Sequence, residues 1–189
     1  MARLRSLAIV GLLTVACGHG DPRPTALAPE SPRMIDPVEL EVVADPNVTA
    51  VDGAEPAALA AGEWLRFQMI SLAKGCRGNY RFVVRRDGAA LLARNQRSDC
   101  PPPQRFDTPY PAAPTATLDG AARAAVQATI DRVGFFQLAT GWRNRAGVDD
   151  GAMMILDIAG PAGLHRVVVM QGEHPAVKAI HDEVMRHLR

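Results

Sequence analysis

The chain is poor in the residues that usually carry enzyme chemistry. Its 189 residues include three cysteines, two tryptophans, two tyrosines and five phenylalanines. The few serines, Ser6, Ser31, Ser71 and Ser98, do not lie in a Gly-x-Ser-x-Gly turn, so a nucleophile elbow is excluded. Glycine-rich loops for phosphates or dinucleotides are also missing. The sequence therefore predicts no enzyme activity and no cofactor.

Long hydrophobic runs are scarce as well. The apolar run Leu7–Val15 follows Arg3 and Arg5 and is about half of what a membrane-spanning helix needs. A basic start, a short apolar core and small residues predict a secretory signal peptide over residues 1–16.

The pair Ala16-Cys17 resembles the bacterial lipobox, in which the cysteine becomes the lipidated first residue of the mature protein. This resemblance implies palmitate or a related acyl chain on Cys17 and a membrane anchor. We therefore expect a lipoprotein of the bacterial cell envelope, on the periplasmic side or at the outer membrane. The alternative is an ordinary signal peptide in which Cys17 is incidental.

Formal charge is balanced overall, at +1, but unevenly distributed. Residues 17–65 hold nine acids and two arginines, whereas residues 66–105 hold nine basic residues and two acids. A basic segment attracts anionic surfaces. The balanced sum and the predicted export argue against nucleic acid, so we expect an envelope protein or an anionic envelope component as partner. The alternative is a solvated strand face that the acidic leader partly neutralises. The candidate partner-binding residues are Arg77, Arg81, Arg85, Arg86, Phe106 and Tyr110.

Two cysteines, Cys76 and Cys100, remain once Cys17 is assigned to lipid. In an oxidising compartment such a pair predicts a disulfide, with catalytic or metal-binding thiols as the alternative. The disulfide would pin the start of a proline-rich loop, residues 95–116. In this loop Phe106 and Tyr110 either pack on the domain or face a partner.

The domain organisation follows from proline content and periodicity. Residues 17–62 are acidic and proline-rich and predict a flexible tether, although Val38–Val43 alternates like an edge strand. Residues 63–189 predict a single domain. Its alternating runs predict strands over 64–73, 79–86, 89–94, 153–158 and 164–171.

Two helices complete the domain. One begins at Thr117 or Asp119 and ends at Gly134, and the other begins at Pro175. Residues 142–150 are polar and turn-like. The order βββ-α-ββ-α predicts an α+β fold, with a mainly antiparallel sheet and two amphipathic helices on one face.

The histidines and carboxylates are the candidate metal ligands of the chain. His165, His174, His181 and His187 lie late in the chain but lack His-x-x-x-His spacing, so we predict no metal site. The carboxylates Asp149, Asp150 and Asp157 likewise lack a partner whose spacing predicts acid–base chemistry.

Two groups of small bacterial domains are similar in the order of their elements. Cys76-Arg77-Gly78 and Phe135-Phe136 resemble residues of uncharacterised exported lipoprotein domains, over about residues 64–189. The helix, Phe-Phe, strand, strand, helix order over about 117–189 resembles the emfourin-like inhibitors of thermolysin-type metalloproteases. Both resemblances rest on the order of the segments 134–138, 150–151, 154–158, 164–169 and 175–177.

The sequence thus predicts a non-catalytic envelope lipoprotein whose α+β domain binds a partner. The emfourin-like resemblance implies an alternative function, inhibition of a metalloprotease. A third hypothesis, a small metal-dependent hydrolase, rests only on the late histidines.

Overall fold

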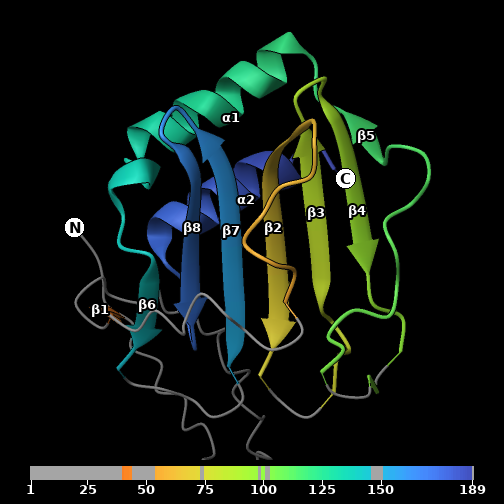
Figure 1. Ribbon diagram of the computed structural model, residues 1–189, viewed down its shortest axis with the longest axis vertical. Coiled ribbons are helices and arrows are strands. Elements are labelled where there is room, and N and C mark those ends of the chain that lie inside the picture. The colour runs from red at the N-terminus through yellow and green to blue at the C-terminus, as the bar shows by residue number, and fades with distance from the viewer. Residues whose placement is uncertain are drawn as a thin grey trace, which may run out of the picture. The chain divides into compact units, whose positions relative to one another are not determined.

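An eight-stranded sheet forms the centre of the protein (Figure 1). The structure is a computed structural model that describes residues 40–43, 54–72, 75–97, 99–100, 103–145 and 151–188. The predicted signal peptide, Cys17 and the pair Asp149-Asp150 lie outside the described residues. In sheet order the strands are β1, β6, β8, β7, β2, β3, β4 and β5.

Antiparallel hairpins make up most of the sheet, so the predicted α+β class and mainly antiparallel pairing are confirmed. Strands β2 (Glu63–Ser71), β3 (Tyr80–Arg85) and β4 (Ala89–Arg94) form a meander. Strands β7 (Ala152–Gly160) and β8 (Gly163–Met170) form a second hairpin, which joins the meander where β7 pairs with β2.

Three short strands extend the sheet beyond the predicted order. Strand β1 (Leu40–Val42) pairs with β6 (Gly141–Asn144), and β5 (Ala116–Thr117) pairs with β4. The alternation of Val38–Val43 indicates a possible edge strand within the predicted tether, and the structure has a strand there over Leu40–Val42. Strand β6 runs parallel to β8.

The turn predicted for residues 142–150 is wrong at its start, because Trp142 lies in β6. The indole Nε1 donates to the carbonyl of Ala139 at 2.9 Å, and the ring centroid lies 4.5 Å from that of His174. His174 is distant from Trp142 in the chain, and so are strands β1 and β8, with which β6 pairs. A strand of four residues is too short for its alternating pattern to be recognised in the sequence. The polar composition of residues 142–150 therefore favours a turn.

Two helices connect and close the sheet. Helix α1 (Gly120–Arg132) begins after Asp119, whose carboxylate accepts from the Ala122 N–H at 2.8 Å. Gly134 has φ +62°, which suits glycine, and a 3-10 turn η3 (Phe135–Gln137) follows. Helix α2 (Pro175–Met185) begins after His174, whose Nδ1 accepts from the Ala176 N–H at 3.2 Å. Among the described residues no helix combines the length and apolar character needed to cross a membrane.

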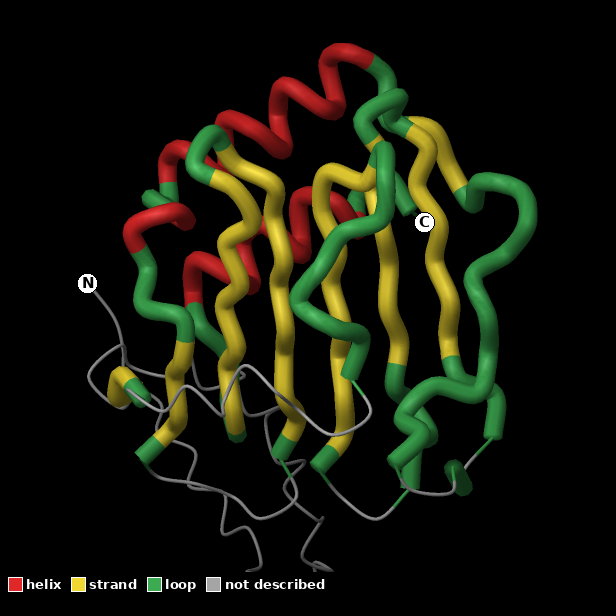
Figure 2. Tube along the Cα trace, in the orientation of Figure 1, coloured by secondary structure: helices red, strands yellow, loops and turns green. Residues whose placement is uncertain are grey.

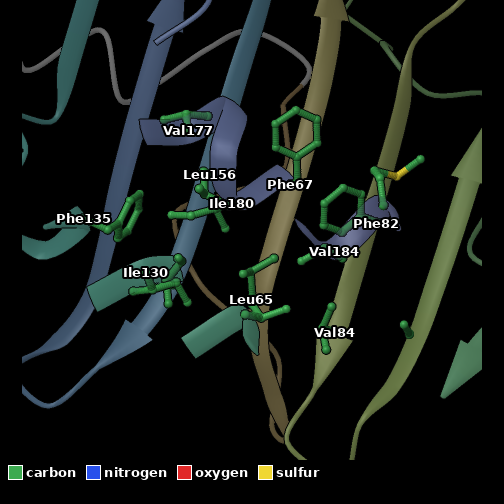
Figure 3. Packing of buried hydrophobic residues seen from close by; sticks show 14 of the residues in the cluster. Leu65, Phe67, Phe82, Val84, Ile130, Phe135, Leu156, Val177, Ile180 and Val184 are labelled. Carbon is green, nitrogen blue, oxygen red and sulfur yellow. The ribbon is translucent and has the colours of Figure 1, made fainter. Parts of the chain in front are cut away.

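The main hydrophobic core lies between the helices and one face of the sheet, which we call the helix face. Figure 3 shows Leu65 and Phe67 of β2 beside Phe82 and Val84 of β3 and side chains of the helices. Alternation along each strand sends every second residue into this layer. The helical contributors are Ala122, Val126, Ile130, Val177, Ile180, Val184 and Met185.

The opposite face, which we call the loop face, is covered by irregular chain. In Figure 2 the segment before β2 crosses in front of the strands, whereas α2 lies behind them and α1 runs along their upper ends. A second apolar cluster, Ile70, Phe106, Met153, Ile155 and Val168, lies on this face. The predicted disulfide between Cys76 and Cys100 is confirmed and ties the proline-rich loop to the β2–β3 connection.

Candidate binding site on the loop face

A row of charged side chains crosses three neighbouring strands of the loop face. The register of the sheet pairs Arg66 of β2 with Asp157 of β7, and Asp157 with Arg166 of β8. The three residues therefore lie side by side on the same face. All three are buried, with Asp157 fully inaccessible.

Asp157 accepts four hydrogen bonds from the two arginines. Arg66 Nε and Nη2 donate to Asp157 Oδ2 at 3.2 and 2.9 Å. Arg166 donates from Nε to Oδ1 at 2.6 Å and from Nη2 to Oδ2 at 2.8 Å. Charged groups are buried in proteins when they are paired in this way. The row is thus a preorganised set of guanidinium groups beneath the surface of the sheet.

A short segment of the chain, residues 54–60, lies over this row, and we call it the strap. Glu55 is its most strongly held residue. The Glu55 N–H donates to Gln68 Oε1 at 2.8 Å, and its carbonyl oxygen accepts from Arg166 Nη2 at 3.0 Å. The next carbonyl, of Pro56, accepts from Arg66 Nη2 at 2.5 Å. Side chains of the sheet thus bind the main chain of the strap.

The Glu55 carboxylate is bound as well. It pairs with Arg66 Nη1 at 3.0 Å and forms a short ion pair with Arg81 of β3. The carboxylate is one-fifth exposed and Arg81 is 15 % exposed, so water screens these pairs more than it screens the row around Asp157. We call Arg66, Arg81 and Arg166 the arginine cluster. Three guanidinium groups against two carboxylates give the site a formal charge of +1.

Arg81 is held between two aromatic rings of the proline-rich loop. Its guanidinium carbon lies 4.7 Å from the centre of the Phe106 ring and 4.6 Å from that of Tyr110. The Nη2 group donates to the carbonyl of Thr108 at 3.0 Å. Burial raises the pKa of Tyr110, so the phenol stays neutral at physiological pH. The rings restrict the orientation of the guanidinium and direct it toward Glu55.

Three buried donors at the site have no hydrogen-bond partner among the described residues. They are Gln68 Nε2, Arg81 Nε and Tyr110 Oη. Unsatisfied buried donors cost free energy, so native structures hold few of them. Here they indicate that the strap satisfies only part of the hydrogen-bonding capacity of the arginine cluster and Gln68.

The structure brings together three of the six candidate residues from the sequence. Arg81, Phe106 and Tyr110 form the cage described above. Arg77 is exposed before the start of β3, whereas Arg85 and Arg86 are exposed at its other end. At about 3.3 Å per strand residue, the length of β3 places about 17 Å between these two ends. The six residues therefore do not form one continuous patch.

The histidines have separate local roles in the described part of the chain. His165 contacts the carbonyl of Leu138 at 3.1 Å, and His174 caps α2. The one group of three possible metal ligands found among the described residues is Cys76, Cys100 and Asp107. Its two sulfurs are joined in the disulfide, so they are not available as thiolate ligands.

A Tyr–His–Asp series lies between β3 and α2. Tyr80 Oη is 2.7 Å from His181 Nε2, and His181 Nδ1 is 2.8 Å from Asp182 Oδ1. This order resembles the nucleophile, base and orienting acid of hydrolases. Burial, however, raises the pKa of Tyr80 to about 12 and lowers that of His181. The hydrogen bond between Tyr80 and His181 joins β3 to α2.

Sequence reasoning missed most of the arginine cluster. Arg66 and Arg166 were not singled out, and Glu55 was assigned to the tether. A usable signal was present in β7, where Asp157 interrupts the apolar run Met153–Ile158. A carboxylate in a strand that is apolar on both faces needs a cationic partner on a neighbouring strand.

The comparisons with known proteins give no family for this chain. No protein-family model matches it, and no curated protein matches its sequence. Function is therefore inferred from the geometry of the site.

Proposed function

We propose that this protein is a non-catalytic lipoprotein of the bacterial cell envelope whose α+β domain binds a protein partner on the loop face. The observation that carries the proposal is the way Arg66, Arg81 and Arg166 hold a segment of chain. They bind a carboxylate and two main-chain carbonyls of the strap. Groups arranged to hold peptide in this way suit a binding surface.

The surroundings of the cluster support the same function. Arg85 is exposed at one end of β3, on the same face of the strand as Arg81, where it adds positive potential to the loop face, and the exposed Arg86 follows it. Positive potential speeds the encounter with an acidic partner more than it strengthens the final complex. The buried arginines would then supply specificity and the exposed ones the rate of association.

Membrane attachment would keep the domain near its partner. A single acyl chain gives only marginal membrane binding, whereas a lipidated and N-acylated Cys17 would supply the several chains that stable anchoring needs. A Cys17→Ala variant should therefore leave the membrane fraction. Retention of that variant in membranes would contradict the anchor but not the binding surface.

Site-specific photo-crosslinking in the native envelope tests the binding surface. A photoreactive amino acid is placed at Ala57 on the strap or at Arg85 on β3, and a matched probe is placed at Lys178 on α2; all three positions are exposed. We expect one protein to be captured from the loop-face positions and not from Lys178. Capture only from Lys178, or of lipid or glycan alone, would contradict the proposal.

A further inference from the structure

We infer that Gln68 and the arginine cluster form a recognition site for an acidic residue followed by proline, which Glu55-Pro56 occupies in cis and an acid–proline segment of a protein partner occupies in trans. This inference rests on the proposed function, because it names the chemistry of the partner and the means by which access is regulated.

The first step is the completeness with which one residue is bound. Side chains of the sheet bind every polar group of Glu55. Gln68 accepts from its N–H, and Arg166 donates to its carbonyl oxygen. Arg66 and Arg81 pair with its carboxylate. Loops usually satisfy their main chain through turns or water. A main chain bound by side chains of another element is the arrangement of a peptide in a binding site.

The second step concerns the proline. Pro56 has no N–H, so it presents no donor to a cationic site, and its carbonyl accepts from Arg66. A residue before proline is restricted to extended conformations, so Glu55 loses little freedom on binding. An acidic residue followed by proline is therefore the sequence that this cluster fits best.

The third step is the capacity that the strap leaves unused. Within the part of the chain that the structure describes, Gln68 Nε2 and Arg81 Nε are buried without acceptors. Counted over Arg66, Arg81, Arg166, Asp157 and Glu55 alone, the formal charge is +1 with the Glu55 carboxylate in place and +2 without it. A second acidic or carbonyl group on a partner segment would satisfy these donors, so a trans segment can form contacts that the strap lacks.

The fourth step is that the strap can be displaced. Pro56, Ala57, Ala58 and Ala60 are exposed, and Ala54 is the strap residue that packs against the apolar cluster of this face. Polar contacts at Glu55 and Pro56 thus provide most of the attachment. Because the strap is part of the same chain, it competes at an effective concentration on the order of millimolar. It therefore excludes weak acidic peptides and yields to a better ligand.

Peptide binding to the full chain tests the inference. A fluorescent peptide with the sequence of residues 54–62 is titrated into the wild type and into Glu55→Ala, with Glu173→Ala as an exposed control. We expect the peptide to bind Glu55→Ala about tenfold more tightly than the wild type or the control, since the cis carboxylate no longer competes. The same peptide with Gln in place of Glu should bind Glu55→Ala about tenfold more weakly.

A measurement on the wild type keeps the test independent of the folding of the variant. The Ala60 N–H donates to Glu63 Oε2 at 2.9 Å while the strap is in place. Millimolar peptide should displace the strap and speed hydrogen exchange at this amide. The Gln peptide should leave the exchange rate unchanged.

The outcomes separate this inference from the proposed function. Equal affinity for the Glu and Gln peptides, or equal affinity of the peptide for Glu55→Ala and wild type, would overturn the cis–trans exchange. Capture of a partner from Ala57 and Arg85 would then still support a binding surface on the loop face. Absence of capture together with tight, Glu-dependent peptide binding would instead overturn the proposed envelope partner.

Discussion

Replacing Asp157 with Asn would measure how strongly the charged row depends on its central carboxylate. Asp157 is fully buried and accepts four hydrogen bonds from Arg66 and Arg166. The variant leaves two buried guanidinium groups facing an amide, and breaking a buried ion pair costs about 3–5 kcal/mol of unfolding free energy. With a urea m-value of about 2 kcal/mol/M, the midpoint should fall by about 1.5–2.5 M.

Asp131→Asn is the matched control for this experiment. Asp131 is exposed on α1 and accepts a hydrogen bond from Gln127 at 2.8 Å. Replacing it should therefore change the free energy of unfolding by less than about 0.5 kcal/mol. A shift for Asp157→Asn no larger than that of the control would refute the reasoning. The triple variant Arg66→Met, Asp157→Leu, Arg166→Met should recover most of the loss, because it removes every charge of the row while Glu55 keeps its ion pair with Arg81.

Three further predictions concern the disulfide, the buried histidine and a glycine turn. Replacing Cys76 and Cys100 with Ser should lower the free energy of unfolding by about 3 kcal/mol, because the bond joins residues 24 apart; a loss below about 1 kcal/mol in urea titration would contradict this. Burial lowers the pKa of His181, so as the pH falls the unfolded state binds a proton at this histidine before the folded state does. The free energy of unfolding should therefore fall by up to about 1.4 kcal/mol per pH unit below about pH 6.5. His181→Gln should flatten this slope, and equal slopes for the variant and the wild type would refute the prediction. Gly88→Ala should cost about 2 kcal/mol more than Gly62→Ala, since both have positive φ but a Cβ at Gly88 would lie 2.2 Å from the Leu118 carbonyl oxygen; equal melting temperatures would contradict the clash.

The regular elements of the domain were largely predictable, because their signals are local. Alternation located β2, β3, β4, β7 and β8, and the cap at Asp119 located the start of α1. The disulfide followed from counting cysteines. Each of these features is determined by residues near it in the chain or by composition.

The remaining strands depend on pairing between distant segments. Strand β6 has four residues, and it forms because β8 offers a free parallel edge to Gly141, Trp142 and Arg143. Strand β5 has two residues and pairs with the start of β4. Neither length allows a periodic pattern to be recognised.

The candidate site was only partly predictable for the same reason. Arg81, Phe106 and Tyr110 were chosen for charge and aromatic character, and the structure brings them together. The rest depends on register: Arg66 and Arg166 flank Asp157 only because three strands align at one row. Glu55 reaches the row from a segment whose composition is typical of a tether.

The central claim is that the arginine cluster is a specific binding site for an acidic segment. Its most direct test is the affinity of the labelled 54–62 peptide for double variants that combine Glu55→Ala with the replacement of one arginine. Arg81 and Arg85 lie on the same strand, but Arg81 contacts Glu55 and Arg85 is exposed. In variants whose circular dichroism matches that of Glu55→Ala, the account predicts that Arg81→Gln weakens binding about tenfold or more and Arg85→Gln less than about twofold. Equal losses for the two replacements would contradict a specific site at the arginine cluster and would indicate binding by net charge alone.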